Sequence, residues 1–273
     1  MIAVEAPVNP STAYTIAICK GSALLEETRA LLRAWNPDEP LDGFAARVLR
    51  QDLLGKATAY RVRDIVRRVF ARRYLQPDHH PARNLKHLLE SLASGPWFSD
   101  LCFLYASRAD HLLHDVVTEF YWPAMDEGRL TVLPRAIVGF IQEAQQTGRM
   151  RAPWSKPVQV KVARGLLKAL TDFGLLREVV RGRRETVVYH PTDLAMVYLA
   201  HDLHASGLTD AALLDHADWG LYGIRPSHRF EVLNRLGGDG WWIAQGAGSV
   251  VRITWKYDTL EEAVDALAGR HLR

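Results

Sequence analysis

The sequence has few cysteines, and their scarcity limits the chemistry open to the chain. Only Cys19 and Cys102 occur among 273 residues, and each lies in an apolar segment. A buried free cysteine behaves as a small apolar side chain. We therefore expect two reduced thiols, no disulfide framework and no CxxC metal site, which is typical of a cytoplasmic protein.

Long apolar runs and a secretory start are also missing. The best apolar run, residues 101–106, stops at Arg108 and Asp110. A membrane-spanning helix needs roughly 18 or more apolar residues. The first residues include Glu5 and Pro7 and lack the basic start and apolar core of a signal peptide. We therefore expect no membrane partner.

Familiar catalytic patterns do not occur. The chain has no GxSxG, HExxH or nucleotide-binding motif, and its acids are scattered. His111 with His114, and His201 with His204, stand at helical spacing, but a catalytic zinc site usually takes three protein ligands. We therefore expect a non-enzymatic protein with no catalytic residue, no metal, no other cofactor and no small-molecule substrate.

Charge is present in both signs but is unevenly distributed. The net charge is +3; residues 193–273 carry 7 basic and 11 acidic residues, and residues 1–192 carry 27 basic and 20 acidic ones. Such asymmetry favours a polyanionic partner for the basic part.

Apolar periodicity and turn residues predict a mainly α, multi-helical fold with helix-turn-helix or winged-helix modules and small β-hairpins. Ser22 is expected to cap a first helix that ends near Trp35. The sequence predicts four parts: an N-terminal helix-turn-helix-like domain (13–80), a central helical core (81–130), a winged helix-turn-helix (131–192) and a C-terminal α+β segment with a hairpin (193–273).

A predicted helix over 57–74 has one apolar and one basic face. Seven basic residues and a single acid, Asp64, lie between Lys56 and Arg73. Arginines on one helical face suit a DNA groove, because they neutralise phosphates and can read guanine edges. A solvated surface is the alternative. The residues expected to contact DNA are Lys56, Arg61, Arg63, Arg67, Arg68 and Arg72.

A second basic region has the layout of a winged helix-turn-helix. Helices over 134–146 and 155–173 precede a strand (175–180), a polar turn (181–185) and a second strand (186–189). The N-terminal part of a recognition helix enters the groove; a module for protein contacts is the alternative. The residues expected to contact DNA are Lys156, Gln159, Lys161, Arg164, Lys168, Arg181, Arg183 and Arg184.

Long stretches of the chain resemble the BrxA family of bacterial BREX phage-resistance systems, over about residues 14–268. The resemblance implies a mainly helical protein with helix-turn-helix or winged-helix parts that binds double-stranded DNA alongside other BREX proteins. It implies no catalytic residue. The stretches that carry it are GSALLEETR (21–29), LGKATAYRVRDIVRRVFARRYL (54–75), LCFLYASRADHLLHDVVTEFYWP (101–123), VARGLLKALTDFGLL (162–176) and GSVVRITWKYDTLEEAVDAL (248–267).

The sequence thus predicts a non-enzymatic, double-stranded-DNA-binding accessory protein of a BREX-type phage-defence system. Its expected partners are duplex DNA and other BREX proteins, and a homodimer is compatible with the sequence. An RNA-binding, antitermination-like factor and a protein-interaction scaffold within the defence complex are the alternatives. The sequence leaves open which basic helix enters a groove.

Overall fold

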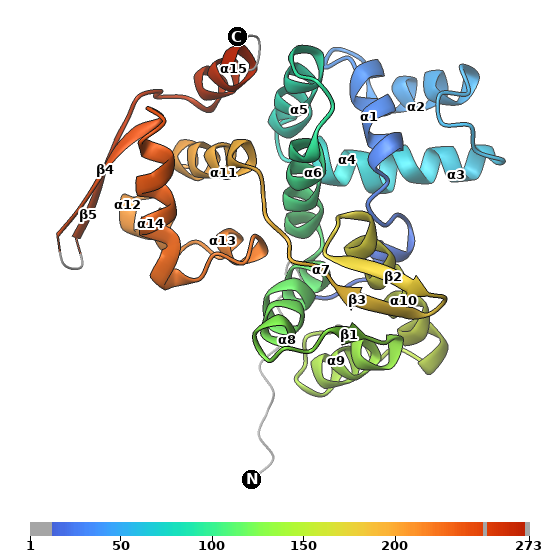
Figure 1. Cartoon of the computed structure of the whole chain (residues 1–273). Coiled ribbons are helices and arrows are strands. Elements are labelled where there is room, and N and C mark those ends of the chain that lie inside the picture. The colour runs from blue at the N-terminus through green and yellow to red at the C-terminus, as the bar shows by residue number, and fades with distance from the viewer. Residues whose placement is uncertain (1–12, 248–249, 271–273) are drawn as a thin grey trace. The chain divides into compact units, whose positions relative to one another are not determined.

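The computed structural model describes residues 13–247 and 250–270. This part of the chain is mainly helical and holds two small antiparallel sheets (Figure 1), which confirms the expected fold class. The chain divides into two compact units. Unit 1 comprises Met1–His79 and Cys102–Tyr189, and unit 2 comprises His80–Leu101 and His190–Arg273. The four-part division expected from the sequence stays a prediction.

Helices form most of unit 1, and helix α6 (Pro96–Ala109) begins in unit 2 and ends here. The strands are β1 (Thr131–Val132), β2 (Leu176–Val180) and β3 (Arg183–Thr186). The other helical segments are η1 (Ala17–Cys19), α1 (Leu25–Ala34), α2 (Leu41–Arg50), α3 (Ala59–Asp64), η2 (Ile65–Phe70), α4 (Ala71–Tyr74), α7 (His111–Asp115), η3 (Val116–Tyr121), α8 (Trp122–Asp126), α9 (Pro134–Gln146) and α10 (Lys156–Asp172).

The basic helix predicted over 57–74 is one continuous helical stretch with a π-helical middle, η2. Thr58 starts it, because its hydroxyl accepts a hydrogen bond from the Arg61 backbone N–H at 3.2 Å. The predicted apolar stripe is buried as a set. Its members are Val62, Ile65, Val66, Val69 and Phe70.

The start of α1 differs from the expectation. Leu24, in the left-handed conformation with φ 52°, holds the N-cap position, and the Ser22 hydroxyl donates to Asp172 Oδ2 at 2.9 Å instead. Buried Arg73 donates to the carbonyls of Gly21 (2.8 Å), Ser22 (2.8 Å) and Ala23 (3.3 Å). The predicted Ser22 cap was wrong, because these longer-range bonds hold the turn.

The small sheet of unit 1 has the strand order β1–β3–β2, all antiparallel. The turn between β2 and β3 is only Arg181 and Gly182, and Gly182 has φ 84°. A glycine accepts such a φ without steric cost. The five-residue turn expected at 181–185 was therefore too long, and β3 starts at Arg183. Strand β1, which pairs Thr131 with Glu185, was not predicted.

Unit 2 combines helices with one two-stranded hairpin. Its core includes an aromatic cluster in which His201, 1% exposed, packs against Trp242 and Trp255. Short helices α12 and α13 were not predicted from the sequence. Its elements are α5 (His80–Ser91), α11 (Asp193–Ala205), α12 (Asp210–Asp215), α13 (Asp218–Leu221), α14 (Pro226–Gly237), β4 (Trp242–Ala247), β5 (Val250–Trp255) and α15 (Leu260–Arg270).

Candidate nucleic-acid interface

Helix α10 exposes a ridge of cations in unit 1. Pro157 lies in its first turn, and Ser155 holds the N-cap position without a side-chain cap bond. The apolar face packs inward, with Val162, Leu166 and Leu170 buried. The opposite face is solvent-exposed along the whole helix. It carries Lys156, Val160, Lys161, Arg164 and Lys168.

Three of the four cations on this ridge carry no protein partner within the described residues: Lys156, Lys161 and Arg164 have no ion pair or side-chain hydrogen bond there. Lys168 pairs with Asp172, with 2.9 Å between Nζ and Oδ2, although 63% of its side chain is exposed. The three unpaired cations have positive charge available for an anionic partner.

Gln159 lies on the inner side of α10 and is 4% exposed. Its amide donates to the Trp154 carbonyl at 3.0 Å and to Gln145 Oε1 at 3.3 Å, and it accepts from Gln142 at 3.3 Å. A side chain engaged in this way has no free edge for a base. Gln159 therefore has no place in the interface that we propose.

The hairpin after α10 exposes only part of its charge. Arg181 is exposed in the turn, and Arg183 is 53% exposed beside Glu185, at 3.4 Å. Arg184 is 15% exposed and is held by Thr171 at 3.0 Å and Glu178 at 3.5 Å. Arg181 and Arg183 can reach a ligand, whereas Arg184 braces the hairpin against α10.

In the first basic segment, Lys56–Arg73, some cations are also engaged by other groups of the protein. Lys56 precedes α3 and pairs with Glu27 at 2.6 Å. Arg61 is half-buried and donates to the Lys20 carbonyl. The remaining predicted residues form a basic surface on α3, η2 and α4: Arg63, Arg67, Arg68 and Arg72.

Lys20 joins this surface. It was not among the residues predicted to contact DNA, because it is a single lysine outside the basic run. A pocket of about 470 Å³ is lined by Lys20, Arg67, Arg68 and Arg72 among others. Asp64 partly offsets their charge, because it contacts Lys20 at 3.2 Å and Arg68 at 3.1 Å. Hydrogen bonding to Asp64 raises the pKa of Lys20, so that the ammonium stays charged.

A short segment around η1 contacts both basic helices. Ile18 lies 3.4 Å from the site that a Cβ on Gly165 of α10 would occupy, and Ser22 bonds to Asp172. Lys20, between these two residues, pairs with Asp64 of α3. The two basic helices predicted separately are therefore linked within unit 1 by residues 18–22.

Metal ligands do not gather anywhere in the described residues: no group of three or more His, Cys, Asp or Glu side chains is placed to hold an ion. His201 is buried among aromatic rings, and His114 pairs with Asp115 at 3.1 Å. None of the helices within 13–247 and 250–270 is long and apolar enough to cross a membrane.

The fold and this surface define a mainly helical protein with exposed cations along two linked helices. A sequence model of the BrxA family matches residues 12–194, and the chain belongs to that family. Membership makes it a BREX phage-defence-associated protein. The matched region contains both basic helices but not the stretch 248–267 that also resembled the family.

A structural relative agrees with the fold. The crystal structure of an uncharacterized protein from Magnetospirillum magneticum superposes with a TM-score of 0.57 and 14% identity, over 70% of this chain and 94% of that one. At this identity the likeness concerns the fold alone. A comparison with curated proteins finds no match.

Proposed function

We propose that this chain is a non-enzymatic accessory protein that binds double-stranded DNA within a BREX-type phage-defence system. The observation that carries the proposal is the exposed cation ridge of α10, in which Lys156, Lys161 and Arg164 have no partner among the described residues. A hairpin with a basic turn follows it directly. Phosphate contacts from such cations supply most of the non-specific affinity for duplex DNA.

The order of elements supports a groove-reading role for α10. Helix α8, strand β1, helices α9 and α10, and the β2–β3 hairpin follow one another as in a winged helix-turn-helix domain. In such domains the second helix of the helix-turn-helix lies in the major groove. In that arrangement Lys156 and Val160, near the start of α10, face base edges, and Lys161 and Arg164 contact phosphates.

The α3–η2–α4 surface supplies a second basic contact area in the same unit. Its cations add phosphate contacts next to those of α10, because the η1 segment links the two helices. We propose that both helices contribute to one DNA-binding surface.

Duplex DNA suits this surface better than single-stranded RNA. Proteins that bind single strands stack bases on exposed aromatic rings. Among the described residues Tyr60, 65% exposed, is the one strongly exposed aromatic side chain. One ring does not make a stacking platform.

A competition assay tests the choice between the two nucleic acids. Full-length protein is bound to a labelled random-sequence duplex at about 50 mM salt, where phosphate-driven binding is strong. Unlabelled duplex DNA is expected to displace the label at a concentration at least about tenfold below that of a structured RNA of equal length. Displacement by RNA at the lower concentration contradicts the proposal and favours the RNA-binding alternative.

A further inference from the structure

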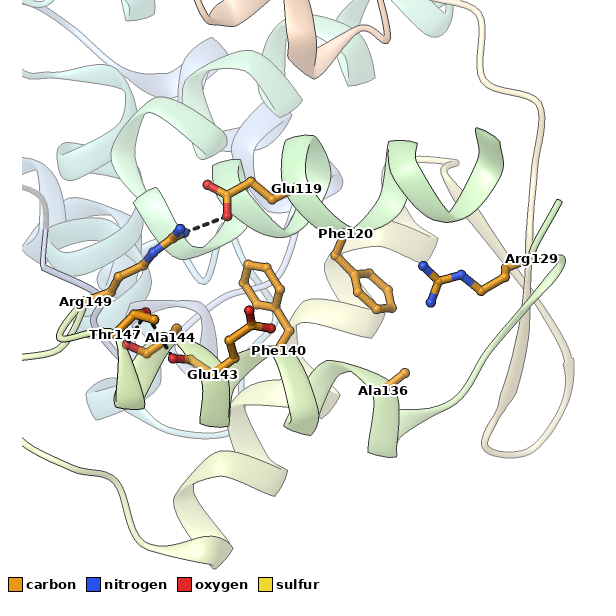
Figure 2. Close-up of a pocket in the computed structure, with 9 residues that line it drawn as sticks. All are labelled: Glu119, Phe120, Arg129, Ala136, Phe140, Glu143, Ala144, Thr147 and Arg149. Atoms are coloured by element: carbon orange, nitrogen blue, oxygen red, sulfur yellow. Dashed lines mark hydrogen bonds and ion pairs between the residues drawn. The ribbon is translucent and has the colours of Figure 1, made fainter. Parts of the chain in front are cut away.

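A different surface of unit 1 is neither basic nor flat. A pocket of about 440 Å³ opens between η3 and α9, and Figure 2 shows the side chains around it. The lining residues are Glu119, Phe120, Arg129, Ala136, Phe140, Glu143, Ala144, Thr147 and Arg149.

The centre of this pocket is apolar. The rings of Phe120 and Phe140 meet edge to face, with 6.2 Å between centroids and 68° between planes, and both side chains are only half-buried. Ala136 and Ala144, on the same helix as Phe140, are too small to fill the space. The pocket therefore offers aromatic surface and room for a bulky apolar side chain.

Two glutamates and two arginines line this apolar centre, and carboxylates engage both arginines. Arg149 is already engaged, because it contacts Glu119 at 2.7 Å and Asp115 at 3.3 Å. Arg129 pairs with Glu127 at 2.7 Å. These pairs engage both guanidinium groups that line the pocket, so that neither is free for an anion.

Of the two glutamates that line the pocket, Glu143 has no partner in the part of the chain that the structure describes. Figure 2 shows Glu143 extending toward the pocket beside Phe140. Within the described residues, no ion pair or hydrogen bond engages its side chain. A half-open site that combines aromatic rings with an uncompensated carboxylate suits a cationic, apolar ligand.

We propose that this pocket docks a partner protein by accepting one bulky apolar side chain that is flanked by lysine or arginine. The apolar side chain packs on Phe120 and Phe140, and the flanking cation pairs with Glu143. Docking surfaces draw most of their binding energy from such a central anchor. The proposal does not depend on DNA binding, because no residue of the α10 ridge or of the α3–η2–α4 surface lines the pocket.

Peptide titrations of the full-length protein test this proposal. The probes are capped seven-residue peptides in a glycine–serine background, with phenylalanine between two lysines, alanine between two lysines, or phenylalanine between two glutamates. Ring resonances of ¹³C-labelled phenylalanine report on Phe120 and Phe140. The lysine–phenylalanine–lysine peptide is expected to bind, and each of the other two is expected to bind at least about tenfold more weakly.

Two variants and their matched controls locate the binding. Ala136→Trp fills the pocket and Glu143→Gln removes its unpaired charge, and each is expected to weaken binding about tenfold. Gln146→Trp, exposed on the same helix, and Glu261→Gln, exposed on α15, are expected to leave it unchanged. Circular dichroism confirms that each variant is folded. Equal binding to wild type and Ala136→Trp, or no preference for the lysine-flanked phenylalanine, overturns the proposal.

Discussion

At the scale of single residues, Arg73 has a structural role, although it belongs to a basic helix whose other arginines are mostly exposed. It belongs to the basic run Lys56–Arg73, yet it is 7% exposed, and its guanidinium caps three consecutive carbonyls before α1. Its neighbour Arg72 lines the basic pocket. Spacing alone cannot separate these two roles, because the bonds of Arg73 reach residues about fifty positions away.

The buried bonds of Arg73 predict a large effect on stability. Replacing Arg73 with Met leaves these carbonyls without their donors, and a buried unsatisfied group costs about 1–3 kcal/mol. We expect Arg73→Met to lower the free energy of unfolding by about 3 kcal/mol in urea denaturation. Arg63→Met, on the exposed face of the same helix, is the control and is expected to change it by less than about 0.5 kcal/mol. Similar losses for both variants would contradict this role.

His201 predicts a pH dependence of stability in unit 2. Burial lowers the pKa of His201 to about 4, whereas an unfolded histidine titrates near pH 6.5. Below pH 6.5 the unfolded chain therefore binds a proton that the folded chain does not. The stabilisation from neutral His201 is complete above pH 6.5 and is lost as the pH falls toward 4. The free energy of unfolding falls by roughly 3 kcal/mol over this range.

A variant separates this effect from the titration of carboxylates. His201→Phe keeps a ring among Trp242 and Trp255 but cannot take up a proton. We expect its thermal unfolding midpoint to fall less than that of wild type between pH 6.5 and 4. Parallel pH profiles for the two proteins would show that His201 is not the group responsible.

At the scale of elements, the sequence predicts correctly the helices that depend on neighbouring residues. It does not predict the features that depend on contacts between residues far apart in the chain. Helix α9 has the predicted bounds Pro134–Gln146, because a proline start and an apolar period lie within the segment itself. Strand β1 has two residues and exists only through its pairing with β3. The burial of Gln159 depends likewise on Gln142 and Gln145 of the neighbouring helix. Sequence periodicity alone does not contain such contacts.

The two basic helices can be compared by charge reversal. The double variant Lys161→Glu/Arg164→Glu on α10 is expected to weaken duplex binding at least about a hundredfold, because two phosphate contacts become repulsive. Arg63→Glu/Arg67→Glu is expected to weaken it less, about tenfold, since Arg67 is already paired with Asp42 at 2.8 Å. Affinities come from gel shifts with one duplex at fixed salt.

The control variant reverses the charge of two basic residues outside both basic helices. Arg252→Glu/Lys256→Glu makes the same change in net charge on exposed residues of unit 2. We expect it to alter duplex affinity by less than about threefold. A loss as large as that of the α10 variant would mean that net charge, and not the ridge, determines binding.

At the scale of the whole molecule, opposite kinds of surface occur on one chain. Unit 1 carries the basic helices and also the aromatic pocket between η3 and α9 that Glu143 lines. Residues 193–273 add a segment with an excess of acids. The two proposed surfaces, one for DNA and one for a basic protein segment, suit an accessory factor that joins the two.

The salt dependence of duplex binding shows whether the exposed cations of α10 and its hairpin bind DNA phosphates. Apart from Lys168, which pairs with Asp172, five exposed cations lie on α10 and at the tip of the β2–β3 hairpin: Lys156, Lys161, Arg164, Arg181 and Arg183. Lys156 faces base edges in the proposed arrangement. If the other four neutralise phosphates, the logarithm of the binding constant falls with the logarithm of salt concentration at a slope of about −3.6, and contacts from the α3–η2–α4 surface steepen it. The Lys161→Glu/Arg164→Glu variant is expected to flatten that slope by about 2. Absence of any duplex shift at about 50 mM salt, or a slope near zero, would contradict the account.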